Sequence, residues 1–378
     1  MSSTAYSPAA RFASTRWRSS SIIASASASI VTGSSFTLAA HHACRAGRQR
    51  GSGVAPSSLH PVRAFITGMT GFVGRHLVAA LGADGMVVHG TLLPGLGETP
   101  PPGAIGHEVD ITDPHAMAAL LADVAPDSIV HLAAAASVGQ SFSDPDGTWH
   151  VNVEGTRGVL DGMRHGAPAA RMVMALSGEE YGRVPLEQLP VTEHTPLNPV
   201  SPYARSKVAA DQLCERYHRD HGLAVVRLRA FNQIGPGQDL RFVVPSICKQ
   251  IADAEMAGDG TCTLELGNID TRRDFMDVRD VVSAYRLLLQ QGDPDRTYLA
   301  GTGRSHSIRD LIDIAVSLAL VPVQVTSDPS RIREGEQPDL YASPRALQEL
   351  GWAPRIPLEQ SIQDTLDYWR DRAHMEVD

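Results

Sequence analysis

A tyrosine and a lysine four residues apart, Tyr203 and Lys207, are the side chains best suited to chemistry in this sequence. Side chains at this spacing share one face of a helix, and Pro202-Tyr203 opens a predicted helical stretch. A phenol with its ordinary pKa of about 10 is a poor acid or base at neutral pH, and a nearby ammonium lowers that pKa. The pair therefore predicts proton transfer at a substrate oxygen, with Lys207 tuning Tyr203.

A serine and a glutamate are candidates to assist this pair. Ser177 directly follows the apolar run Arg171–Leu176. A hydroxyl at this place can hydrogen-bond a substrate carbonyl or alcohol and align it with Tyr203, although a turn or cap serine has the same surroundings in sequence. Glu179 is either an acid–base group or a surface turn residue, and the sequence leaves this choice open.

Three glycines, Gly68, Gly71 and Gly74, stand between a short apolar run and a helical stretch. Glycines in this context let the chain turn tightly and let backbone N–H groups approach a pyrophosphate at a helix N-terminus, whereas glycines kept only for packing are the alternative. We therefore expect a nicotinamide dinucleotide here. The loop residues predicted to contact it are Gly68, Thr70, Gly71, Phe72, Val73, Gly74 and Arg75.

The choice between NAD and NADP is poorly marked, with a slight preference for NADP. An acid about 20 residues beyond the glycines would bind the ribose hydroxyls of NAD. Thr91–Pro94 at that place contains neither an acid nor an arginine. Arg75 either approaches the 2′-phosphate of NADP or is a solvated helix residue. Asp110, followed by Ile111, is predicted to accept a hydrogen bond from the adenine amine, and capping of the next helix is its alternative.

Short apolar runs alternate with helical stretches from Val62 onward. The expected strands are Arg63–Thr67, Met86–Thr91, His107–Asp110, Ser128–Ala133, Arg171–Leu176 and Ala224–Ala230. The expected helices between them are Gly74–Leu81, Pro114–Val124, Trp149–His165 and Tyr203–His221. Such alternation predicts an α/β fold, a Rossmann-type doubly wound parallel sheet covered on both faces.

The alternation ends after Phe231, where turns rich in Gly and Pro occupy Ile234–Gln238. Further helices are expected near Val243–Ala257, Val278–Gln290, Ser307–Leu320, Pro344–Leu350 and Pro357–Arg372. We expect a smaller α/β C-terminal substrate-binding lobe that closes over the strand ends, where parallel sheets bind ligands. The predicted division is an extension at 1–61, a mainly NAD(P)-binding domain at 62–240, and a mainly substrate-binding lobe at 241–372 with some strand exchange back to the first domain.

The charge is unevenly spread. The net charge is −9, and the first 62 residues contribute six Arg and no acid, so the remainder carries −15. An acidic body argues against nucleic acid as a partner, because phosphate binding needs a basic surface. No apolar run approaches the roughly 20 residues that cross a bilayer, so no membrane partner is expected.

The first sixty residues, rich in Ser, Ala, Gly and Arg, have the composition of an organellar transit peptide. A disordered tail or an upstream region read from a wrong start are the alternatives. The expected location is cytoplasmic, or organellar if this segment is a transit peptide. The four cysteines, Cys44, Cys214, Cys248 and Cys262, show no C-x-x-C spacing and no His cluster, so no metal site and no disulfide framework are expected.

Taken together, these residues resemble the extended short-chain dehydrogenase/reductase family, over about Arg63–Arg370. Ser177, Tyr203 and Lys207 match its catalytic triad, while Leu176 and Glu180 beside Ser177 depart from the usual pattern, as does Ala230 where Pro is common. The segments Val130–Ala134 and Asn152–Thr156 are similar to the family's fourth strand and next helix. The resemblance implies that Leu132, Ala133 and Ala134 line the cofactor. It also implies a homodimer formed through Trp149–His165 and Tyr203–His221.

The resemblance further implies a nucleotide-sugar substrate. Asn232, within Arg229–Gln238, would contact its diphosphate, and Arg273 would grip the same group. Arg333 and Glu336 are similar to a late R-x-x-E pair that meets a phosphate and the nucleoside ribose. Arginine suits this task because it binds phosphate with two parallel hydrogen bonds, although each Arg is also compatible with a surface ion pair.

Within this family, three segments are most similar to members that reduce the C4 keto group of a GDP-4-keto-6-deoxy sugar: Phe231–Gln238, Leu264–Val281 and Asp328–Gln337. The expected protein is therefore an NAD(P)-dependent oxidoreductase acting on a GDP-sugar. A GDP-mannose 4,6-dehydratase stays open, because Glu179 offers the base that elimination of water needs. A nucleotide-sugar 4-epimerase stays open as well. A non-catalytic NAD(P)-binding sensor is the remaining alternative, and it has no need of Ser177, Tyr203 and Lys207 together.

Overall fold

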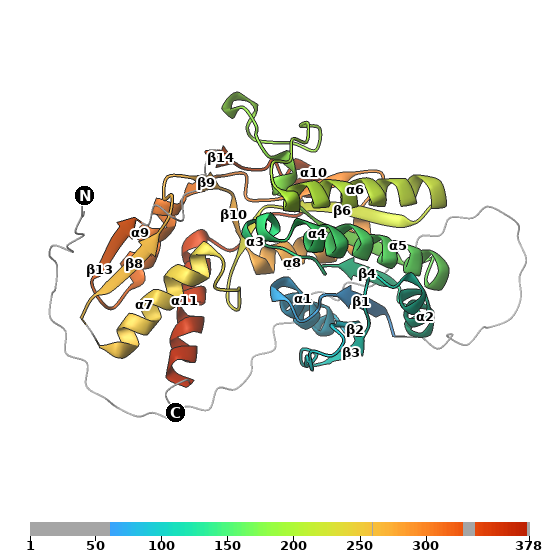
Figure 1. The fold of residues 1–378 in the computed structure, drawn as a ribbon, viewed down its shortest axis with the longest axis horizontal. Helices are drawn as coiled ribbons and strands as arrows, with labels where there is room; N and C mark the ends of the chain where they lie inside the picture. Colours follow the sequence, from blue (N-terminus) through green and yellow to red (C-terminus); the bar gives the residue numbers. More distant parts are fainter. Residues whose placement is uncertain (1–60, 259, 328–336, 376–378) are drawn as a thin grey trace, which may run out of the picture. The chain divides into compact units, whose positions relative to one another are not determined.

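A seven-stranded parallel sheet is the centre of the computed structural model, which describes residues 61–258, 260–327 and 337–375. The strand order is β11-β6-β5-β4-β1-β2-β3, and every neighbouring pair is parallel (Figure 1). The strands are β1 (Arg63–Thr67), β2 (Val87–Leu92), β3 (Ala104–Glu108), β4 (Ser128–His131), β5 (Arg171–Ser177), β6 (Ala224–Ala230) and β11 (Thr297–Ala300). The chain winds outward from β1 in both directions, which confirms the predicted doubly wound sheet.

Helices cover both faces of this sheet. α1 (Phe72–Ala83) and α8 (Val278–Gln291) pack on one face, where Ile66 of β1 joins their apolar side chains. α2 (Pro114–Val124), α5 (Gly155–Gly166) and α6 (Pro202–His221) pack on the other face, where Phe65 is buried. Because successive side chains of a strand point to opposite faces, β1 and β4 need apolar residues at consecutive positions. Burial on both faces therefore explains why Ala64–Ile66 and Ile129–Val130 are apolar at consecutive positions.

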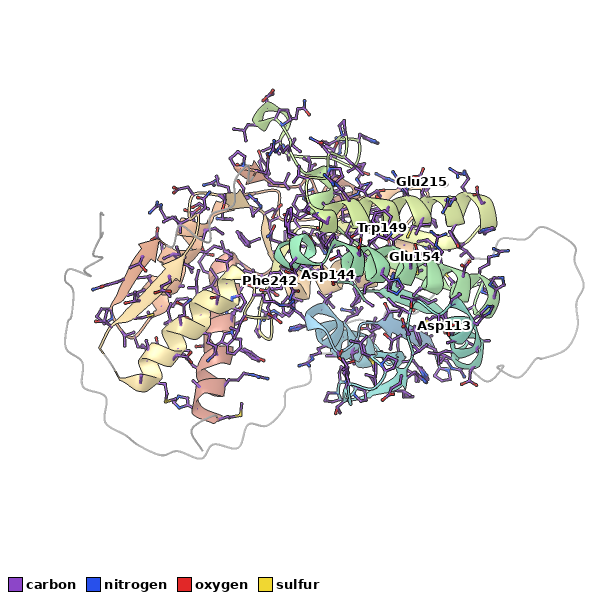
Figure 2. All side chains as sticks on the ribbon, viewed as in Figure 1. Asp113, Asp144, Trp149, Glu154, Glu215 and Phe242 are labelled. Carbon is purple, nitrogen blue, oxygen red and sulfur yellow. The ribbon has the colours of Figure 1, made fainter. Side chains whose placement is uncertain are left out.

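Most predicted elements differ from the observed ones by a few residues at their ends, and two differ more. The third strand, expected at His107–Asp110, runs over Ala104–Glu108 and pairs with β2 at the sheet edge. Its residues are mostly half-buried or exposed, so apolar patterning marks it weakly. The helix expected at Trp149–His165 is three consecutive segments, namely α4 (Pro145–Trp149), a π-helical turn (His150–Glu154) and α5. Figure 2 shows Trp149 and Glu154 along this stretch.

The later part of the chain has an apolar core of its own. α7 (Val243–Ala257), α9 (Ile308–Leu318) and α11 (Leu358–Met375) pack with the parallel pair β8 (Cys262–Leu266) and β13 (Val323–Ser327) (Figure 1). These helices, with α10 (Arg345–Glu349), fall where helices are expected from the sequence. The strands β8, β11 and β13 are not predicted by it. Shorter elements that it also does not predict include α3 (Val138–Ser143), β7 (Asn232–Ile234), β9 (Arg272–Arg273), β10 (Phe275–Asp277), β12 (His306–Ser307) and β14 (Asp339–Leu340).

The chain returns to the central sheet after residue 240. β7 and β10 form a parallel pair, and α8 and β11 then pack on and extend the seven-stranded sheet. The described residues from Pro61 onward belong to one compact unit, so a domain boundary at 240 stays a prediction. Within the described ranges, no helix combines the length and apolar character required for a membrane span.

Candidate active site

A cavity of about 590 Å³ lies at the carboxyl ends of the central strands. Segments that follow β1, β4, β5 and β6 line it, together with the start of α6. Of the residues predicted from the sequence, those lining it are Gly68, Thr70, Gly71, Phe72, Val73, Gly74, Arg75, Leu132, Ala134, Ser177, Glu179, Tyr203, Lys207 and Asn232. The fold thus brings the predicted cofactor loop and the predicted catalytic residues to one place.

The glycine loop has the geometry of a dinucleotide cradle. Gly68 has a φ of +68°, and a Cβ there would lie 2.9 Å from the backbone of Ala133. A Cβ on Gly74 would lie 2.5 Å from the carbonyl oxygen of Gly68. α1 starts at this loop with no side-chain cap and no acid in its first turn, so no side chain of its own competes with an anion for its N-terminal N–H groups. The loop therefore fits a pyrophosphate.

Polar side chains beneath the loop hold the neighbouring cofactor segment. The Thr67 hydroxyl accepts from the backbone N of Leu132 and of Ala133, each at 3.1 Å, so its proton goes to Nδ1 of His131 at 2.6 Å. His131 Nε2 then donates to Thr156, 3.1 Å away. Burial lowers the pKa of His131 to about 3, which keeps this ring neutral. Leu132 and Ala133 are thus positioned by a buried hydrogen-bond chain.

Several predicted binding residues lie elsewhere. Asp110 and Ile111 are not among the residues that line the cavity, and Asp110 accepts from Thr112 N at 2.9 Å. The cap of α2 is Asp113, so the capping alternative for Asp110 is wrong. Ala133 packs against Gly68 rather than into the cavity, and Arg273 Nη1 donates to the carbonyl oxygen of Gln337 at 2.9 Å. Arg333 and Glu336 lie outside the described residues.

An acid that the sequence pattern does not predict reaches the glycine loop. Glu98 accepts from the Thr70 hydroxyl at 3.0 Å and from Leu93 N, at the end of β2, at 2.8 Å. The usual spacing places a ribose-binding acid directly after the second strand, where Thr91–Pro94 offers none. Here a turn folds Glu98 back to the same place. On the other side of Thr70, Arg75 Nε donates to its carbonyl oxygen at 2.7 Å.

The three predicted catalytic side chains meet where β5 ends and α6 begins. Ser177 is the last residue of β5, and it lines the cavity together with Tyr203 of α6. Ser201 caps α6 and Pro202 occupies its first turn, which fixes the start of this helix. One turn after Tyr203, Lys207 is buried and its Nζ donates to the carbonyl oxygen of Ala175 at 2.9 Å.

The buried setting changes the acidity of both groups on α6. Burial raises the pKa of Tyr203, and the neighbouring Ser177 hydroxyl opposes that shift. This net direction is opposite to the lowering expected from Lys207. Burial also lowers the pKa of Lys207 to about 8. A phenol that keeps its proton at neutral pH is suited to donate it, as the reduction of a carbonyl requires.

Asn152 connects the cofactor segment to the catalytic helix. From the π-helical turn its Oδ1 accepts from Ala135 N at 2.8 Å, and its Nδ2 donates to the Ser206 hydroxyl at 2.9 Å. Ser206 directly precedes Lys207. The π-helical turn therefore gives Asn152 the position from which it holds α6 against the loop after β4. The sequence indicates this residue only through the family resemblance.

A doubly wound sheet, a glycine cradle and a Ser–Tyr–Lys set at one cavity define the class of Rossmann-fold oxidoreductases that use a nicotinamide cofactor. The family model described as GDP-mannose 4,6 dehydratase matches residues 65–365. The chain is 36% identical to GDP-6-deoxy-D-mannose reductase from Pseudomonas aeruginosa over 315 residues, covering 83% of this chain and 99% of that protein.

Solved structures agree with this match. RMD from Pseudomonas aeruginosa, complexed with NADPH, has a TM-score of 0.72 at 35% identity, covering 82% of this chain and 99% of that one. UDP-glucose 4-epimerase from Thermotoga maritima, with UDP-glucose, has a TM-score of 0.75 at 26% identity, and the match covers 82% of this chain and 99% of that one. The chain belongs to the extended short-chain dehydrogenase/reductase family, in its GDP-mannose 4,6-dehydratase group. The predictions of the fold, the family, an NAD(P) cofactor and an oxidoreductase are confirmed.

Proposed function

We propose that this enzyme uses NAD(P)H to reduce the C4 keto group of a GDP-4-keto-6-deoxy sugar, giving GDP-rhamnose or its 4-epimer. The observation that carries the proposal is that Ser177, Tyr203 and Lys207 line the same cavity as the glycine cradle. The similarity of the chain to GDP-6-deoxy-D-mannose reductase supports the choice of sugar.

Tyr203, Ser177 and Lys207 have separate roles in this reduction. When bound, the reduced nicotinamide supplies the hydride. Tyr203 gives its proton to the C4 oxygen, so the ketone becomes an alcohol and the phenolate is left behind. Ser177 donates a hydrogen bond to the same oxygen and aligns it with Tyr203. Lys207 stabilises the phenolate and binds the ribose hydroxyls of the cofactor.

Several polar side chains are assigned to hold the substrate diphosphate. Asn232 lines the cavity and is available to the diphosphate. Arg241 also lines the cavity. Its Nε donates to Oδ1 of Asp239 at 2.9 Å, and its Nη1 donates to Oε1 of Gln140 in α3 at 2.6 Å. We assign Arg273 to the diphosphate as well, through a movement that frees its guanidinium from Gln337. Arg333 and Glu336 complete this set by resemblance.

A 4,6-dehydratase is the second candidate function, because Glu179 lines the cavity two residues after Ser177. Elimination of water from C5 and C6 requires a base next to the nicotinamide site, and a carboxylate can serve. A 4-epimerase uses the same Ser–Tyr–Lys set. Neither reaction consumes the cofactor overall, whereas the proposed reduction does.

A homodimer is also proposed, formed through Trp149–His165 and Tyr203–His221. Trp149, the last residue of α4, is 45% exposed, so an aromatic side chain at the start of this segment is available to a partner. We propose a cytoplasmic enzyme, or an organellar one if residues 1–60 act as a transit peptide.

The test is a turnover assay with the purified chain. GDP-4-keto-6-deoxymannose is offered with NADPH and, separately, with NADH, and absorbance at the nicotinamide band is followed. The proposal expects stoichiometric oxidation of the cofactor. No oxidation with any nucleotide 4-keto sugar refutes it, and conversion of GDP-mannose without net oxidation identifies the dehydratase.

A further inference from the structure

The hydroxyl of Tyr285, two turns into α8, has no hydrogen-bond partner among the described residues. Tyr285 is only 1% exposed, yet its hydroxyl oxygen is not one of the fully enclosed polar atoms in the part of the chain that the structure describes. Tyr285 also lines the cavity that holds Tyr203 and Lys207. Because a buried tyrosine hydroxyl normally has a partner, the free hydroxyl of Tyr285 indicates that its partner is a ligand.

The direction of α8 explains how a residue two turns along this helix reaches the cavity. The helix begins at Val278, close to the glycine cradle, because a Cβ added to Gly235 would lie 2.8 Å from Cγ1 of Val278 and 3.7 Å from Cζ of Phe72. Phe72 itself lines the cavity. Long side chains of a helix lean toward the N-terminus of that helix. Tyr285 is therefore directed back toward the strand ends, where the cavity lies.

Tyr285 approaches the cavity from the face of the sheet opposite to the catalytic helix. It belongs to the apolar cluster of α1 and α8, whereas α6 packs in the cluster on the other face. Ala175 of β5 and Ala230 of β6 line the cavity and pack in the same cluster as Tyr285. The Ala175 carbonyl accepts from Lys207 at 2.9 Å, and Ala230 lies opposite Ser177 in the strand register. Tyr285 therefore borders the reacting end of the cavity.

We propose that the Tyr285 hydroxyl hydrogen-bonds the nicotinamide half of the cofactor, from the face of the sheet opposite to Tyr203. The glycine cradle is the place for the pyrophosphate, so the nicotinamide half has to lie toward Ser177 and Tyr203, where the hydride is needed. Burial raises the pKa of Tyr285, so the phenol keeps its proton at neutral pH and can donate to a carboxamide or ribose oxygen. The inference goes beyond the proposed function, since it depends on an NAD(P) cofactor and not on the identity of the sugar.

The decisive variant is Tyr285→Phe, which removes the hydroxyl and keeps the ring in its apolar surroundings. The matched control is Tyr298→Phe. Tyr298 of β11 belongs to the same apolar cluster and is also 1% exposed, but it does not line the cavity and its hydroxyl accepts from Asp293 N at 3.0 Å. For each full-length protein, calorimetric titration gives the Kd of NADPH and NADH. It also gives the Kd of 2′-phospho-ADP-ribose and ADP-ribose, which lack the nicotinamide.

In Tyr285→Phe, we expect the Kd of NADPH and of NADH to rise about 3- to 10-fold, which corresponds to one neutral hydrogen bond. The Kd of the two ligands without nicotinamide should not change. The unfolding temperature of the cofactor-free protein should not fall, because no hydrogen bond within the described protein is lost. Tyr298→Phe should have the opposite effects, namely a lower unfolding temperature and four unchanged Kd values.

Three results would overturn the inference. The first is an unchanged Kd of NADPH and NADH in Tyr285→Phe. The second is an equal rise in Kd for all four ligands, which would place the effect at the cradle or in the fold. The third is a higher KM for GDP-4-keto-6-deoxymannose with an unchanged cofactor Kd, which would assign the hydroxyl to the sugar. The titrations need no turnover, so a failure of the proposed reduction is distinguishable from a failure of this inference.

Discussion

Adding one methyl group at Gly74 tests whether the cradle binds the cofactor as described. In Gly74→Ala the new Cβ would lie 2.5 Å from the carbonyl oxygen of Gly68 and 2.7 Å from the backbone of Met69. Both are backbone atoms of the loop, so the loop itself must move. Overpacking of this kind costs about 1–3 kcal/mol, which corresponds to a Kd about 5- to 150-fold higher if the movement is undone on binding.

The control lies two turns further along the same helix. A Cβ added at Gly82 would have no atom within 4 Å, so Gly82→Ala makes the same chemical change without a clash. Alanine also favours a helix over glycine by about 0.5–1 kcal/mol, so this variant should unfold at the same or a higher temperature. Kd values for NADPH and NADH are measured by fluorescence titration of the folded proteins. If Gly74→Ala binds within twofold of Gly82→Ala, the cradle is not the binding site.

Two further predictions concern cofactor choice and acid stability. Glu98 lies where the adenosine ribose of the cofactor is expected, and Arg75 lies on the other side of Thr70. Glu98→Gln should therefore raise the ratio of NADPH affinity to NADH affinity several-fold, and Arg75→Ala should lower this ratio. Competition titrations measure the ratio, and an unchanged ratio in both variants would show that neither residue contacts the ribose. The lowered pKa of His131 means that the unfolded chain binds the extra proton first, so stability is lost as the pH falls below about 6.5 toward 3. Between pH 7.5 and 5, the unfolding temperature should therefore fall more steeply in the wild type than in His131→Gln. Parallel plots of unfolding temperature against pH for the two proteins would contradict this.

The central strands of the sheet are predictable from the sequence, because burial on both faces requires apolar residues at consecutive positions. Ala64–Ile66 of β1 and Met172–Leu176 of β5 are continuous apolar runs, and the glycines of the loop are required by close backbone contacts. The edge strand β3 is misplaced by the sequence pattern because only a little of its surface is buried. The two-residue strands β9, β12 and β14 exist through contacts between distant segments, which no local pattern records.

The catalytic trio is predictable because its spacing and place follow from one helix and one strand end. Glu98 is not, because its position depends on how the turn after β2 folds back. Glu180 and Arg229 are visible in the sequence only as a departure from a family pattern and as part of a segment. In the structure they form a buried ion pair, with Arg229 Nε 3.0 Å from Oε2 of Glu180. This contact joins the turn after β5 to β6, and no local sequence pattern records it.

The direct test of the central claim is Tyr203→Phe, which removes one oxygen and leaves the ring. NADPH or NADH affinity and thermal stability are measured beside single-turnover oxidation of the bound cofactor by GDP-4-keto-6-deoxymannose. We predict affinity within a few-fold of the wild type and hydride transfer slowed by about 10²- to 10⁴-fold, the usual contribution of a positioned proton donor. Transfer at the wild-type rate would contradict the assignment of Tyr203 as the donor to the C4 oxygen.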